Sequence, residues 1–119
     1  MLLLMSDITD LQKKIVAFRD ERNWQQFHKP KDVAISLCLE AAELLEHFQW
    51  KTRAEFNEHF KKHRDDVSDE LVDVLYWVLL MAHDLDIDLP KEFDRKMAKN
   101  AQKYPVAKAH GKPTKYTEL

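Results

Sequence analysis

The sequence predicts an all-α fold, a single domain that resembles a four-helix bundle. Apolar residues recur at intervals of three and four along most of the chain, which is the spacing of one helix face. The chain has one glycine, and its four prolines stand between the periodic segments. A length of 119 residues suits one hydrophobic core and is short for two. We therefore expect one domain over residues 1–119, with irregular ends at about residues 1–6 and 105–119.

The helices follow from the apolar spacing and from residues that favour helix ends. In order, we expect them at about residues 7–24, 32–49, 53–60, 65–85 and 90–104. Asp32 and Thr52 are suited to N-caps, because their side-chain oxygens can accept hydrogen bonds from the first turn. Pro90 is suited to a first turn, where no backbone N–H is needed.

Composition and charge exclude several classes of function. The net charge is -2, and no segment concentrates lysine and arginine beyond short pairs, so we expect no long nucleic acid as a partner. A single glycine excludes a Gly-rich phosphate loop, and the single cysteine, Cys38, excludes an intrachain disulfide. The opening "MLLLM" is shorter than a signal-peptide core, and no apolar stretch reaches about 20 residues. We expect a cytoplasmic protein without a membrane partner.

Two of the expected helices are apolar almost all round, except for one narrow acidic strip on each. The strip of residues 32–49 carries Glu40 and Glu43, and that of residues 65–85 carries Glu70 and Asp73. Facing strips would bring four carboxylates into one cleft, where protons or a cation must neutralise them. A set of oxygen ligands suits a hard cation such as Mg²⁺, with Mn²⁺ as a substitute.

Two other interpretations of these acids stay open. Each pair also fits a solvated helix face within a non-catalytic helical oligomerisation module. A carboxylate-bundle protein that binds iron would use inward acids too, but it favours a Glu-x-x-His motif, and no histidine lies three residues after a glutamate. A helix with two apolar faces in so small a protein predicts that another subunit covers one of them. We therefore expect a homo-oligomer, a dimer or a tetramer.

Several motifs, in order along the chain, resemble one enzyme family. "LEAAELLEHFQW" followed by "DELVDVLYWVLLMA" resembles the paired acidic motif of the MazG-like all-α nucleoside triphosphate pyrophosphohydrolases, most closely the dCTP pyrophosphatase group. "FRDERNWQQFHKPKDVAISL", "KMAKNAQKYP" and "KYTEL" are also similar to segments of that group. The resemblance implies Mg²⁺-dependent hydrolysis of a (deoxy)nucleoside triphosphate, such as dCTP, to the monophosphate and pyrophosphate. It also implies that the catalytic metal ligands are Glu40, Glu43, Glu70 and Asp73.

The same resemblance implies contacts to phosphate and sugar near the end of the last helix. The residues that match the family's "KMxxNxxKYP" pattern are Lys96, Asn100, Lys103 and Tyr104. A solvated helix end, where the helix dipole favours lysine, would account for the same residues.

The resemblance further implies a base pocket lined by Trp24, His28 and Trp50, since nucleobases stack on aromatic rings. A tryptophan near a helix end is also common in a core or an interface. Trp77 lies on the acidic strip and stands where the dCTP pyrophosphatases have tyrosine, which leaves the nucleotide preference open.

Overall fold

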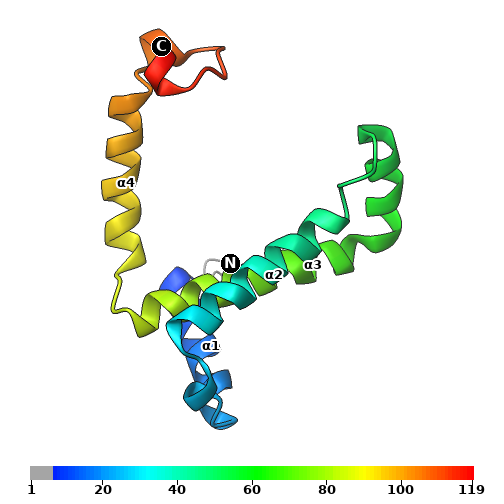
Figure 1. Ribbon diagram of the computed structural model, residues 1–119, viewed down its shortest axis with the longest axis vertical. Coiled ribbons are helices and arrows are strands. Elements are labelled where there is room, and N and C mark those ends of the chain that lie inside the picture. Colours follow the sequence, from blue (N-terminus) through cyan, green and yellow to red (C-terminus); the bar gives the residue numbers. More distant parts are fainter. Residues whose placement is uncertain (1–6) are drawn as a thin grey trace, which may run out of the picture. The chain divides into compact units, whose positions relative to one another are not determined.

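The computed structural model describes residues 7–119, and these are helical with no strand among them (Figure 1). The predicted all-α class is thus confirmed for this part of the chain, whereas the predicted irregular end at residues 1–6 lies outside the described residues. The chain separates into two compact units, Met1–Asp86 and Ile87–Leu119. The single domain over residues 1–119 stays a prediction.

Three helices build the first unit. They are α1 (Ile8–Glu21), α2 (Pro30–Glu46) and α3 (Arg53–Asp84), with a 3₁₀ turn at Gln25–Phe27 before α2. Helix α2 runs antiparallel along α3, and α1 packs against α3 as well (Figure 1). The long hairpin of α2 and α3 therefore sets the two predicted acidic strips beside each other.

The ends of α2 and α3 show which capping signals decide a helix boundary. Asp32 as the N-cap of α2 is wrong, because α2 begins two residues earlier at Pro30, with Lys29 as its N-cap. Proline at the first helical position has φ preset and no N–H to satisfy, and it leaves Asp32 in the first turn. Thr52 caps α3 as predicted. Its hydroxyl accepts from the Glu55 N–H at 3.2 Å, and the Glu55 carboxylate accepts from the Thr52 N–H at 3.0 Å, which completes a capping box.

The helices expected at residues 53–60 and 65–85 are present as two helical segments of α3 that meet at a kink. His63 has non-helical backbone angles (φ -125°, ψ 28°) and separates the two segments, although residues 61–64 contain no glycine or proline. The bend separates an N-terminal arm rich in histidine and phenylalanine from the part of α3 that carries Glu70 and Asp73.

The core of this unit lies where α1 and α2 cover the C-terminal half of α3. The buried apolar residues are Val33, Val67, Leu79, Leu80 and Ala82. Leu71 and Leu85 of α3 are half exposed, whereas Leu79 is fully buried. The reason is α1, because the Gln12 side chain donates a hydrogen bond of 2.9 Å to the carbonyl of Leu79 and holds α1 over that face.

One charged side chain is buried in this core. Arg19 of α1 is 0% exposed, and its guanidinium donates to Asp84 at the end of α3 at 2.8 Å. Partial burial alone would raise the pKa of Asp84, but the hydrogen bonds and charges of Arg19 and His83 outweigh it and lower the pKa. Asp84 is therefore the ion-pair partner of the buried Arg19.

The second unit consists of helices α4 (Leu89–Lys103) and α5 (Val106–Ala109) and a 3₁₀ turn at Tyr116–Glu118. Asp88 caps α4, and Pro90 stands in its first turn as predicted. Residues 105–119, expected to be irregular, thus contain two short helical pieces. No helix among residues 7–119 has the length and apolar character needed to cross a lipid bilayer.

Candidate active site

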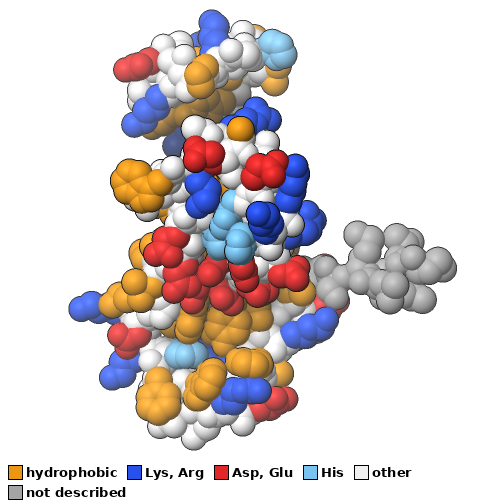
Figure 2. Space-filling model, turned by 90° about the vertical axis from the view of Figure 1, so that its right-hand side faces the viewer, with side chains coloured by type: hydrophobic (Ala, Val, Ile, Leu, Met, Phe, Trp, Pro, Cys, Tyr) orange, Lys and Arg blue, Asp and Glu red, His pale blue; other side chains and the backbone are white. Residues whose placement is uncertain are grey.

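Three carboxylates meet where α2 and α3 face each other. Glu40 and Glu43 lie three residues apart on one face of α2, and Glu70 comes from α3 opposite. One carboxylate oxygen from each lies within 4.8 Å of the other two. Figure 2 shows acidic side chains gathered in one band on this face of the molecule. We call Glu40, Glu43 and Glu70 the carboxylate cluster.

Burial and mutual repulsion disfavour the ionised forms of Glu40 and Glu70 in the carboxylate cluster. Burial, followed by hydrogen bonding to and repulsion from Glu43, raises the pKa of Glu40 to about 7. Burial and the same neighbour raise the pKa of Glu70. One oxygen each of Glu40 and Glu70 is buried without a hydrogen-bond partner among the described residues. Buried polar atoms are normally paired, so these oxygens need a proton or a cation.

The donor set fits a hard divalent cation. It offers three carboxylate oxygens close together, and the buried oxygens of Glu40 and Glu70 have no hydrogen-bond partner among the described residues. Oxygen ligands of this kind bind Mg²⁺ and Mn²⁺ in preference to soft transition metals. The structure brings together three of the four acids that we proposed from the sequence as metal ligands. The fourth, Asp73, lies one helical turn from Glu70 on α3 and lines the adjoining pocket with Glu40.

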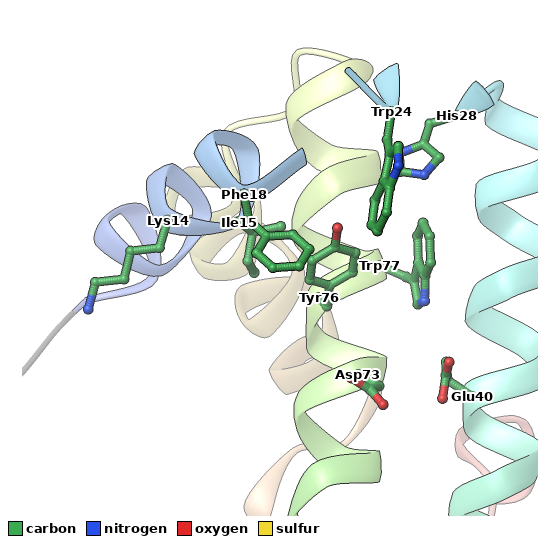
Figure 3. A pocket seen from close by; sticks show the side chains of 9 residues that line it. All are labelled: Lys14, Ile15, Phe18, Trp24, His28, Glu40, Asp73, Tyr76 and Trp77. Atoms are coloured by element: carbon green, nitrogen blue, oxygen red, sulfur yellow. The ribbon is translucent and has the colours of Figure 1, made fainter. Parts of the chain in front are cut away.

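An aromatic pocket of about 470 Å³ adjoins the carboxylate cluster (Figure 3). Its lining residues are Lys14, Ile15, Phe18, Trp24, His28, Glu40, Asp73, Tyr76 and Trp77. In Figure 3, Asp73 and Glu40 face each other from α3 and α2, and Trp77 lies between them and His28. The His28 and Trp77 rings meet edge to face with centroids 5.2 Å apart. The pocket therefore joins apolar walls to an acidic end.

His28 is the polar group among the aromatic walls of this pocket. Burial, and then the charge of Arg19, lower the pKa of His28, so the ring is neutral at pH 7. Its Nδ1 is buried without a hydrogen-bond partner among the described residues. A neutral imidazole can offer one donor and one acceptor to a planar ligand that enters the pocket.

The other residues proposed from the sequence lie elsewhere. Trp50 is 85% exposed in the connection between α2 and α3 and is not among the residues that line the aromatic pocket. The remaining four, Lys96, Asn100, Lys103 and Tyr104, belong to the second unit. There, Lys96 donates to the Asn100 side chain at 2.9 Å, and the Lys103 ammonium lies 4.6 Å from the Tyr116 ring centroid.

Four residues that line the pocket were not proposed from the sequence as site residues: Lys14, Ile15, Phe18 and Tyr76. Phe18 and Tyr76 form edge-to-face contacts with Trp24 and Trp77, at 5.9 Å and 5.0 Å between centroids. In the sequence both belong to ordinary apolar faces. Tyr76 stands next to Trp77 in the sequence, beside the acidic strip. This pair of aromatic residues is the sequence feature that could have predicted Tyr76 as a pocket residue.

Comparisons with known proteins agree with the resemblance seen in the sequence. The MazG-like family model matches residues 35–119. The dCTP pyrophosphatase 1 of Rattus norvegicus is 38% identical over 114 residues, which is 94% of this chain and 67% of the relative, and that of Homo sapiens is 36% identical over the same shares. The crystal structure of a pyrophosphatase from Archaeoglobus fulgidus superposes with a TM-score of 0.76 at 36% identity, covering 85% of this chain and 94% of that one. The chain therefore belongs to the MazG-like family.

Proposed function

We propose that this chain is a metal-dependent nucleoside triphosphate pyrophosphohydrolase acting on dCTP or related deoxynucleoside triphosphates. The observation that carries the proposal is the junction of the carboxylate cluster with the aromatic pocket through Glu40. A base in the pocket would place its phosphates at the acids. The relatives named dCTP pyrophosphatase 1 support the substrate class.

In the proposed reaction, a water oxygen bonds to the α-phosphorus, and the bond from this phosphorus to the oxygen bridging to the β-phosphate breaks. The products are the monophosphate and pyrophosphate, and the proton of the water passes to a carboxylate. When bound, Mg²⁺ neutralises polyphosphate charge, and the residues that would hold it are Glu40, Glu43, Glu70 and Asp73. A carboxylate of the cluster also orients the water.

Recognition of the base falls to the aromatic pocket. Trp24 and Trp77 offer faces for stacking, and His28 offers its unpaired ring nitrogen to a polar edge of the base. Trp50 follows the end of α2 that lies away from this pocket, so we assign it to the base site of a neighbouring subunit. Contacts to phosphate and sugar are assigned to Lys96, Asn100, Lys103 and Tyr104.

The substrate class is tested by incubating the four dNTPs and four NTPs with the protein and Mg²⁺ while measuring pyrophosphate and orthophosphate separately. We expect pyrophosphate release, fastest with dCTP or a related deoxynucleotide, and no release after chelation of the metal. A non-catalytic oligomerisation module would be indifferent to both. The proposal fails if no triphosphate is cleaved and none raises the melting temperature.

We also assign the chain to a homo-oligomer, a dimer or a tetramer. Ile35 and Leu39 on α2 and Val72 on α3 are 48%, 59% and 61% exposed, although all three are large and apolar. Large apolar side chains that are exposed on so small a protein favour an interface in which a second copy of the chain buries them. Exposed Trp50 is suited to the same contact.

Leu39→Glu is expected to dissociate the oligomer, because it places a charge within the apolar face. Sedimentation should then give a mass near the monomer value of 14.2 kDa, against a multiple of it for the unmodified protein. Lys31→Glu, which changes the charge of an exposed residue on the same helix, is the control and should leave the mass unchanged. An unmodified protein that sediments as a monomer would contradict this assignment.

A further inference from the structure

Three histidines form a connected group that the proposed chemistry does not use. His47 follows the last turn of α2, and His59 and His63 lie on the N-terminal arm of α3. The Nδ1 of His47 lies 2.9 Å from the Nε2 of His59, which is a hydrogen bond. The rings of His59 and His63 stack with centroids 4.4 Å apart, and the Nδ1 of His63 lies 3.1 Å from Asp66. We call His47, His59 and His63 the histidine chain.

The histidine chain continues the acidic strip on the side away from the aromatic pocket. On α2, His47 comes one turn after Glu43, a rise of about 6 Å. On antiparallel α3, Asp66 and His63 come one and two turns before Glu70. Figure 2 shows histidine side chains bordering the band of acids on one side and apolar side chains bordering it on the other.

This order matches the order of groups in a nucleoside triphosphate. With the base among Trp77 and His28 and the α-phosphate at the carboxylate cluster, the β- and γ-phosphates extend toward His47. The acids cannot bind these oxygens directly, because both carry negative charge. The terminal phosphates therefore need donors beyond the acids.

The histidine chain can supply such donors. In the hydrogen bond between His47 and His59, one nitrogen donates and the other accepts, so the accepting ring can offer the N–H of its other nitrogen to an anion. Burial, and then the charge of Lys51, lower the pKa of His59. Asp66 is the acid that faces the group, and it is engaged by His63.

A transition-metal site is the competing explanation, and the geometry disfavours it. Among the described residues, the potential ligand atoms that converge in threes belong to Glu40, Glu43 and Glu70, not to the histidines. Only two imidazole nitrogens of the histidine chain meet, and Asp66 occupies the Nδ1 of His63. A closed metal site normally needs three or four protein ligands.

We infer that the histidine chain is the subsite for the terminal phosphates, holding the β- and γ-phosphates of the substrate and then the pyrophosphate product. This inference rests on the proposed function for the identity of the ligand. It assigns the histidine chain a role in binding and leaves the bond-breaking step to the acids.

The test is calorimetric titration of the Mg²⁺-loaded protein with inorganic pyrophosphate, and separately with dCMP, which lacks terminal phosphates. Loss of one charge-assisted hydrogen bond should weaken pyrophosphate binding about tenfold in His47→Leu and in His59→Leu, with dCMP binding unchanged. The matched control is His110→Leu, an exposed histidine of the second unit, which should bind pyrophosphate like the unmodified protein. Circular dichroism checks the fold, and His59→Gln, which keeps a donor, should lose less affinity than His59→Leu.

Pyrophosphate affinity unchanged in both leucine variants would overturn the inference. Tight Zn²⁺ binding that is lost in His59→Leu while pyrophosphate affinity stays constant would overturn it in favour of a metal site. Failure of the proposed function looks different, because the unmodified protein would then cleave no triphosphate, whereas the titration reads pyrophosphate binding directly.

Discussion

Glu40→Gln is expected to lower kcat/KM for triphosphate hydrolysis by about 10²–10³-fold, the loss seen when one preorganised charged group leaves an active site. Glu40 belongs both to the carboxylate cluster and to the aromatic pocket, so its loss would affect both the proposed metal site and the proposed base site. The measurement is pyrophosphate release with saturating Mg²⁺. Glu58→Gln, which alters an exposed acid of α3, is the matched control and should retain full activity.

The same variant should be more stable than the unmodified protein when metal is removed at high pH. The pKa of Glu40 is about 7 in the fold and 4.5 in a free side chain, so the folded state disfavours ionisation. Stability of the metal-free protein is therefore lost as pH rises from about 4.5 through 7, and glutamine removes this loss. Thermal melting with a chelator at about pH 5 and about pH 8 measures the change in stability with pH for both proteins. The unmodified protein should lose more stability at the higher pH than Glu40→Gln does. Equal pH dependence in Glu40→Gln and the unmodified protein would contradict the account of the cluster.

Asp84→Ala is expected to reduce the free energy of unfolding by about 3–5 kcal/mol, because it leaves a buried guanidinium without its main partner. Arg19 is fully buried, and beyond Asp84 its nearest acid is Asp20, 3.7 Å away and largely exposed. Urea unfolding at one fixed protein concentration measures the change.

The double variant Arg19→Met with Asp84→Leu is the control for this prediction. It removes both charges together, and apolar replacements of buried ion pairs are often neutral, so it should recover most of the lost stability. A single Asp84→Ala variant within about 1 kcal/mol of the unmodified protein would show that water reaches Arg19 after all.

The features predictable from the sequence are those set by neighbours along the chain. Thr52 and Glu55 form their capping box within one turn, and Glu40 and Glu43 share a helix face by spacing alone. The start of α2 was misjudged for a local reason too, since Pro30 at the first helical position outweighs Asp32 as a cap.

The remaining features depend on how α1 crosses α3, which periodicity does not encode. Arg19 and Asp84 are 65 residues apart in the sequence, and the contact of Phe18 with Tyr76 likewise joins α1 to α3. The histidine chain depends on the kink at His63 and on the end of α2 meeting the arm of α3. For the same reason the burial of Leu79 depends on α1, which covers that face of α3.

Hydrolysis of dCTP in water enriched in oxygen-18 is the measurement that tests the proposed chemistry most directly. Attack on the α-phosphorus beside the carboxylate cluster predicts one heavy oxygen in the dCMP and none in the pyrophosphate, by mass spectrometry of both products. Heavy oxygen in the pyrophosphate, or dCDP and orthophosphate as products, would contradict the assignment of the α-phosphate to this cluster.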